Sequence, residues 1–247
     1  MASTSETGHA KNAANLQSLI VSVTGYGAAY NPSKTALQLP SLQILSTGCN
    51  NAIKAVNAAI PGYTQAVADR ETAFLPLNKL ATRVLNSIKA TDTSTQVIEN
   101  VQSLIRKIQG TRATPKKTDE EKAALAAEGK ATKEISTSQM SFDNRLDNLD
   151  KLIQLLDSSP LYTPNETDLQ VATLTTYLDE LNRQNAAVKT AIILLSNARI
   201  SRNEIMYKAG SSMVDIALDV KTYIKSVYGA SSPQYKQVSK LAFKSIP

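Results

Sequence analysis

Apolar residues recur every three to four positions along two long stretches of the chain, residues 36–90 and 168–228. Steps of four and then three residues from Leu42, or from Leu174, fall mostly on apolar side chains. This spacing is typical of the contact seam between long helices packed side by side. Sustained over about 30 residues, such a helix is about 45 Å long. The pattern predicts an all-α protein, an elongated helical bundle with long coiled-coil-like helices.

The two stretches belong to an internal repeat. YNPSKTALQL begins at Tyr30 and YTPNETDLQV begins at Tyr162, a spacing of 132 residues. The shared prolines predict loops just before helices, with Thr35 and Thr167 as N-cap residues and the two tyrosines packed against the first turn. The duplication predicts two copies of one structure, related by an approximate two-fold axis.

A charged stretch, residues 110–136, separates the two copies. Within it, Thr118 and Glu121 have the spacing of a capping box, which predicts a short exposed helix. The expected organisation is a first helical repeat at 1–109, this linker, and a second helical repeat at 137–247. The two repeats are expected to form one compact unit.

Composition agrees with helix. Gly and Pro number nine each, Trp is absent and aromatic residues make up 5% of the chain, whereas strands favour aromatic and β-branched residues. Pro61 and Pro76 fall inside the first copy and predict kinks or short breaks. The polar start and the lack of an apolar run near 18 residues predict neither a secretion signal nor a membrane span. With one cysteine, a cytoplasmic location is expected.

Residues that commonly carry catalysis are scarce. His9 is the single histidine and falls in a polar N-terminal tail, while Cys49 falls on the helix seam, where a buried thiol is expected. No glycine-rich phosphate-binding motif occurs, and carboxylate pairs such as Asp147 and Asp150 fall on polar helix faces. We therefore expect no catalytic residue, no metal site, no cofactor and no enzymatic activity.

Two arginines occupy equivalent positions in the apolar seams. Glu71 lies beside Arg70, and Glu204 lies two residues after Arg202. Burying an unpaired charge costs several kcal/mol, so these four residues are candidates for buried ion pairs that fix the helix register. For a fully buried pair, changing one arginine alone to Met would cost about 3–5 kcal/mol. Binding of an anion by these arginines is the alternative.

The net charge of +6 is unevenly spread. Nine basic and five acidic side chains give +4 for residues 1–109, ten and thirteen give −3 for 110–198, and eight and three give +5 for 199–247. Aromatic residues lie among the C-terminal lysines, as base stacking would require, although no known nucleic-acid-binding motif occurs. The candidate contacts to an anionic partner are Arg112, Lys116, Lys117, Lys221, Lys225, Lys236, Lys240 and Lys244.

Three segments, SFDNRLDNLDKLI, LSNARISRNEIMY and SVYGASSPQYKQV, resemble those of a group of uncharacterised bacterial all-helical proteins of about this length. The resemblance extends over nearly the whole chain. It implies a single helical unit of this size and carries no activity with it.

The expected function is that of a structural or scaffold protein that assembles with itself or with another protein. The duplicated long helices support it, because such helices present extended surfaces to partners. A nucleic-acid-binding protein that uses its basic C-terminal segment is the alternative. A helical membrane-docking or pore-forming protein ranks third, because the apolar stretch 186–195 is short and contains Lys189 and Thr190.

Overall fold

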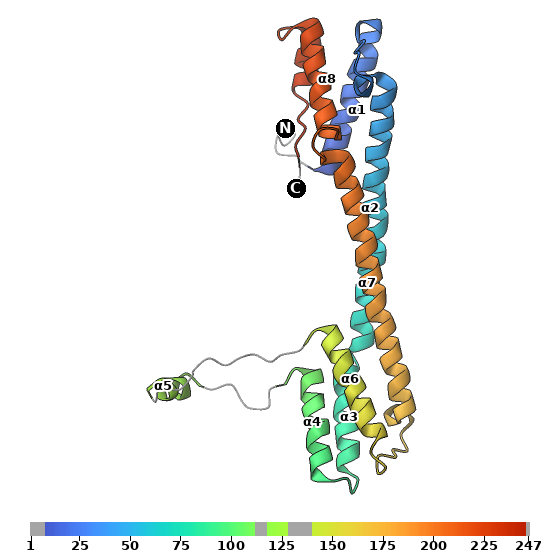
Figure 1. Ribbon diagram of the computed structural model, residues 1–247, viewed down its shortest axis with the longest axis vertical. Coiled ribbons are helices and arrows are strands. Elements are labelled where there is room, and N and C mark those ends of the chain that lie inside the picture. The colour runs from blue at the N-terminus through green and yellow to red at the C-terminus, as the bar shows by residue number, and fades with distance from the viewer. Residues whose placement is uncertain (1–7, 112–117, 128–139, 246–247) are drawn as a thin grey trace. The chain divides into compact units, whose positions relative to one another are not determined.

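The computed structural model describes residues 8–111, 118–127 and 140–245 (Figure 1). Within these ranges the chain is helical and no strand occurs, so the all-α prediction is confirmed. The α-helices are α1 (His9–Tyr26), α2 (Leu39–Phe74), α3 (Leu77–Lys89), α4 (Thr95–Gln109), α5 (Asp119–Ala127), α6 (Phe142–Asp157), α7 (Val171–Tyr207), α8 (Met213–Tyr228) and α9 (Pro233–Ser239). Three short 3-10 helices, η1 (Gly27–Ala29), η2 (Thr35–Leu37) and η3 (Thr167–Leu169), lie in the loops.

The chain divides into two compact units. Unit 1 consists of residues 1–64 and 190–247, and unit 2 consists of residues 65–189. These boundaries do not coincide with the sequence ranges 1–109 and 137–247. The reason is that the long helices α2 and α7 each contribute their first part to one unit and their second part to the other.

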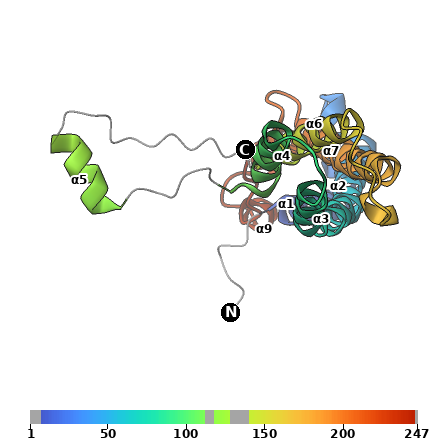
Figure 2. The ribbon, with the colours of Figure 1, turned by 90° about the horizontal axis from the view of Figure 1, so that it is seen from below.

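In unit 2, α3, α4 and α6 pack together with the first part of α7 (Figure 2). Each helix has apolar residues spaced three or four apart, which places them on one face. On α3 these are Leu77, Ala81, Val84 and Ile88, all at most 2% exposed. The same spacing on α4 and α6 completes a single core.

In unit 1, α1 packs against α8 and α9. The chain that follows α9 runs beside α1, where two buried asparagines hold it. The Asn12 side chain donates to the Lys244 carbonyl at 2.7 Å and accepts from the Lys244 amide at 3.2 Å, and Asn15 donates to the Ala242 carbonyl at 2.6 Å. These bonds satisfy polar groups that would otherwise be costly to bury.

The two Tyr-Pro loops close in the same way. The buried Tyr30 hydroxyl donates to the Leu37 carbonyl at 2.7 Å, and the buried Tyr162 hydroxyl donates to the Leu169 carbonyl at 2.9 Å. Each tyrosine therefore fixes its loop to the 3-10 turn that precedes a long helix.

The N-cap assignment of the two threonines is wrong. Thr35 and Thr167 begin 3-10 helices without any side-chain cap hydrogen bond, and the long helices begin at Leu39 and Val171. The sequence indicates a turn after each proline, but it does not show that this turn is separate from the long helix that follows.

The two prolines of the first copy behave differently from each other. Pro76 lies between α2 and α3, as the break predicted there requires. Pro61 lies inside the continuous helix α2, so no break occurs there. Because Pro61 and Asn57 are both exposed, water can bond the carbonyl that the proline leaves without a donor.

The capping box predicted for the short helix α5 is present. The Thr118 hydroxyl accepts from the Glu121 amide at 3.2 Å, and the Glu121 carboxylate accepts from the Thr118 amide at 2.8 Å.

Candidate interaction surfaces

The histidine and the cysteine both occupy packed positions in unit 1. His9 is the first residue of α1 rather than part of a free tail, and its Nδ1 lies 2.7 Å from the Tyr207 hydroxyl. Burial, and then the charge of Arg202, lower the pKa of His9. Cys49 is fully buried, and burial raises its thiol pKa to about 11, so the reactive thiolate is disfavoured. No group of side chains in the described ranges could hold a metal ion.

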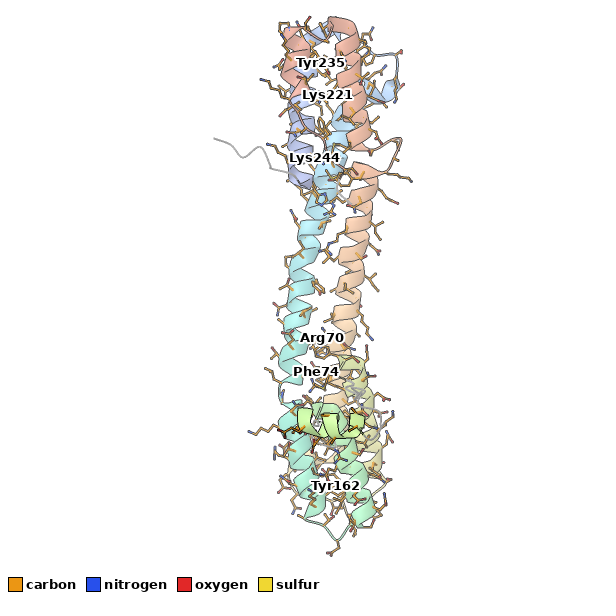
Figure 3. All side chains as sticks on the ribbon, turned by 90° about the vertical axis from the view of Figure 1, so that its left-hand side faces the viewer. Arg70, Phe74, Tyr162, Lys221, Tyr235 and Lys244 are labelled. Carbon is orange, nitrogen blue, oxygen red and sulfur yellow. The ribbon has the colours of Figure 1, made fainter. Side chains whose placement is uncertain are left out.

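Arg70 lies half-buried near the end of α2 (Figure 3). Its guanidinium carbon is 3.9 Å from the centre of the Phe142 ring, and Nη1 donates to Asn185 Oδ1 at 3.2 Å. Asn185 Nδ2 in turn donates to Asp143 Oδ1 at 2.7 Å. An amide therefore stands between the guanidinium and the carboxylate. Arg70 Nε is buried without a hydrogen-bond partner.

Arg202 is also half-buried, in unit 1. Its Nε and Nη2 donate to Asn203 Oδ1 at 3.1 and 2.8 Å, and burial lowers its pKa. No ion pair of Arg202 is present among the described residues.

The four-residue ion-pair hypothesis is thereby corrected. The side chains of Glu71 and Glu204 are exposed, and within the described part of the chain the arginines bond asparagine amides instead. Adjacent residues on a helix point about 100° apart, so Glu71 cannot face the seam together with Arg70.

Lys221 is held inside unit 1 and is poorly placed for an anionic partner. Its Nζ donates to the carbonyls of Ser239 and Leu241 at 3.0 and 2.9 Å, and burial lowers its pKa. It thereby caps the C-terminal end of α9, where carbonyls lack partners within the helix.

The other C-terminal lysines are exposed. These are Lys225, Lys236, Lys240 and Lys244. Lys225 Nζ lies 5.8 Å from the centre of the Tyr235 ring, which joins α8 to α9. Tyr235, Lys221 and Lys244 follow one another along one side of unit 1 (Figure 3). We call Lys225, Lys236 and Lys240 the basic face. Arg112, Lys116 and Lys117 lie outside the described residues.

The C-terminal aromatic residues pack against the core of unit 1. Tyr223 lies edge-on to Tyr30 with ring centres 5.2 Å apart, and Tyr228 lies 5.3 Å from Tyr26. Each ring already has an aromatic partner in its own unit. These contacts weaken the reading in which the tyrosines stack on bases.

An acidic surface on unit 2 was missed in the sequence analysis. Asp143, Asp147, Asp150 and Asp157 follow one another on α6 at steps of four, three and seven, so they share one helix face, and all are exposed. We call these four residues the acidic stripe. The sequence could have revealed this stripe, because its aspartates are spaced with the helical period that was considered above only for apolar residues.

Half of the acidic stripe is neutralised locally. Asp147 pairs with Lys151 at 2.6 Å, and Asp143 pairs with Lys189 at 2.7 Å. The hydrogen bond from Lys189, followed by that from Asn185, lowers the pKa of Asp143. Asp150 and Asp157 have no ion pair among the described residues.

Charge is distributed very differently over the two units. Unit 1 holds eleven basic and four acidic side chains and unit 2 holds sixteen and seventeen, which gives net charges of +7 and −1. Within unit 2, residues 140–181 hold eight acidic and two basic side chains.

Apolar side chains are exposed on the long helices of unit 1. On α7, Ile192, Ile193, Leu194 and Ile200 are 49–61% exposed, and Ile60 on α2 is 41% exposed. No charged residue occurs between Lys54 and Asp69 or between Lys189 and Arg199. This part of unit 1 therefore combines exposed apolar side chains with an absence of charge.

Comparison of the chain with known protein families, with curated proteins and with solved structures finds no match. Among the described residues, no helix has the length and apolar character needed to cross a membrane.

Proposed function

We propose that this protein is a non-enzymatic structural or scaffold protein that acts by assembling with itself or with another protein. The elongated bundle, the duplication and the two-fold axis expected from the sequence are part of this proposal. A cytoplasmic location also belongs to it, supported by the single cysteine.

The exposed apolar residues of α7 are the observation that carries the proposal. The buried cores of protein interfaces are depleted in charged residues. The uncharged segment between Lys189 and Arg199, with Ile192, Ile193 and Leu194 exposed, has this character. Burial of these side chains by a partner would remove apolar surface from water at about 25 cal/mol per Å².

The test is the mass of the purified protein over a range of concentrations, by light scattering, with electron microscopy of the same samples. We expect association that weakens when Ile193 and Ile200 are both changed to Glu. The matched control is Leu75→Glu, at an apolar position of unit 2 that is 76% exposed. A strict monomer at high concentration that also binds no added protein partner would overturn the proposal.

Nucleic-acid binding is the second candidate. The exposed lysines of α8 and α9 favour it, because they have no carboxylate partner in the described part of the chain. Binding to duplex DNA that falls steeply as salt rises would support this candidate. Membrane docking ranks third: the exposed apolar side chains of α7 support it, but Lys189 and Thr190 interrupt that stretch.

A further inference from the structure

We propose that the basic face of one copy binds the acidic stripe of a second copy, so that copies join head to tail. The proposal rests on the self-assembly proposed above and names two surfaces and the partner for it. The partner of each surface is the other surface on another copy of the same chain.

The basic face is a built surface rather than a set of unrelated lysines. Lys221 ties α8 to the end of α9 through two carbonyls, and Lys225 extends from α8 to the Tyr235 ring on α9. These contacts hold the lysines of α8 beside those of α9. Lys236 and Lys240 are four residues apart, so they lie on one side of the chain at the end of α9.

The acidic stripe presents a row of exposed carboxylates on one helix face. Asp143, Asp147 and Asp150 recur about once per helical turn of α6, and Asp157 follows two turns after Asp150. Asp150 and Asp157 lie about two turns, or roughly 10 Å, apart along the helix, and the flexible side chains of Lys236 and Lys240, which are one turn apart, can spread to approach one aspartate each. Asp150 and Asp157 are exposed and have no ion pair in the described ranges, so they are available to lysines of a partner.

Charge favours a second copy as the partner. Two copies of unit 1, each at +7, repel each other, whereas the segment 140–181 of unit 2 holds eight acidic and two basic side chains. The two surfaces are different patches of the chain, so the contact is heterologous. One bound copy leaves a basic face and an acidic stripe free, and further copies can add to form a ring or a filament.

The experiment uses two charge-reversed variants of the full chain. Variant A is Lys236→Glu with Lys240→Glu, and variant B is Asp150→Lys with Asp157→Lys. Alone, each places like charges at the contact, and we expect association to fall about tenfold or more. An equimolar mixture of A and B, and a chain carrying all four changes, should both recover association.

The recovery is the specific part of the test, because misfolded variants would not complement each other. Circular dichroism and thermal unfolding check that each variant is folded. The matched controls make the same change in net charge elsewhere on unit 2, Lys79→Glu with Lys89→Glu for variant A and Asp92→Lys with Glu99→Lys for variant B, and should leave association unchanged. Light scattering and sedimentation velocity give the readout at low and at high salt.

The outcomes separate this proposal from the general one. Wild-type association that neither variant weakens would overturn the head-to-tail contact and leave self-assembly standing. A wild-type chain that stays monomeric at all concentrations would overturn the head-to-tail contact and self-assembly alike, and would leave only assembly with another protein. Loss of DNA binding in variant A without loss of association would overturn the contact in favour of a nucleic-acid partner.

Discussion

Arg70 shows how a half-buried charge is held in a helix seam without a direct ion pair. The Phe142 ring covers the guanidinium, and the Asn185 side chain accepts a hydrogen bond from Arg70 and donates one to Asp143. The arrangement leaves Nε without a bond. Its contribution to stability is therefore expected to come from packing and the ring contact more than from charge pairing.

Changing Arg70 to Met should have little effect on stability. Met keeps apolar contact with Phe142 and removes the unbonded Nε, so we expect a change within about 1 kcal/mol in the free energy of unfolding. Arg70→Ala removes the packing as well and should cost about 1–2 kcal/mol. Urea denaturation measures both. A loss of about 3–5 kcal/mol for Arg70→Met would instead restore the buried ion pair expected from the sequence.

His9 should make stability depend on pH. Its folded pKa is lowered from the ordinary value of 6.5 by burial and by Arg202, so the unfolded chain binds the proton more readily. The neutral ring stabilises the fold fully above the unfolded pKa, and this contribution is lost as pH falls through 6.5 towards the folded value. Carboxylates with lowered pKa values, such as Asp215, change the pH dependence of stability only at lower pH, where they become protonated.

The measurement is urea denaturation between about pH 5 and 7.5, where carboxylates stay ionised. The wild-type protein should lose stability towards pH 5. His9→Gln should show a flatter profile over the same range. Equal slopes for the two proteins would show that the protonation of His9 is not linked to folding.

At the scale of elements, the two Tyr-Pro loops are the best comparison within the chain. Tyr30→Phe and Tyr162→Phe each remove one buried hydrogen bond and leave a loop carbonyl without its donor. We expect each change to lower the free energy of unfolding by about 1–3 kcal/mol, and we expect the two losses to be similar. Tyr63→Phe, on α2, is the control and should stay within about 0.5 kcal/mol. Calorimetry that finds a large cost at one loop alone would argue against equivalent roles.

Helix existence could be read from the sequence, whereas pairing between helices could not. The spacing around Leu42 and Leu174 is enough to place α2 and α7, because it defines one apolar face on each helix. It does not say which residue of a neighbouring helix lies opposite. For this reason the sequence predicts a carboxylate partner for Arg70, whereas the residue that Arg70 contacts is Asn185. The acidic stripe could have been predicted from the sequence, because the helical spacing of its aspartates is visible there.

At the scale of the whole molecule, unit 1 is built from both ends of the chain and unit 2 is built from its middle. The repeat in the sequence predicts helical repeats at 1–109 and 137–247 within one compact unit, whereas the chain divides into two compact units, residues 1–64 with 190–247 and residues 65–189. The helices α2 and α7, of 36 and 37 residues, are each continuous, so no helix end marks where one unit ends. Only the packing of the shorter helices decides the division.

This division predicts how two fragments of the chain behave when they are produced separately. Residues 1–111 contain α1 to α4 but lack α6 to α9, so each unit would miss part of its core. We expect the fragments 1–111 and 140–247 to be poorly folded alone and to regain native helix content and cooperative melting when mixed. Circular dichroism follows the recovery. Cooperative unfolding of the first fragment by itself would contradict the expectation.

The two-segment construction of unit 1 also sets an order of events during synthesis. Unit 2 is one continuous segment and is complete once residue 189 has left the ribosome, whereas residues 1–64 wait for residues 190–247. Until then Leu16, Leu19 and Leu42, fully buried in the finished protein, lack the part of their core that α8 and α9 supply. We expect unit 2 to fold first and nascent α1 to need protection by chaperones. A chain stopped before α8 would keep that apolar surface exposed, so it should aggregate rather than accumulate as a soluble half-folded protein.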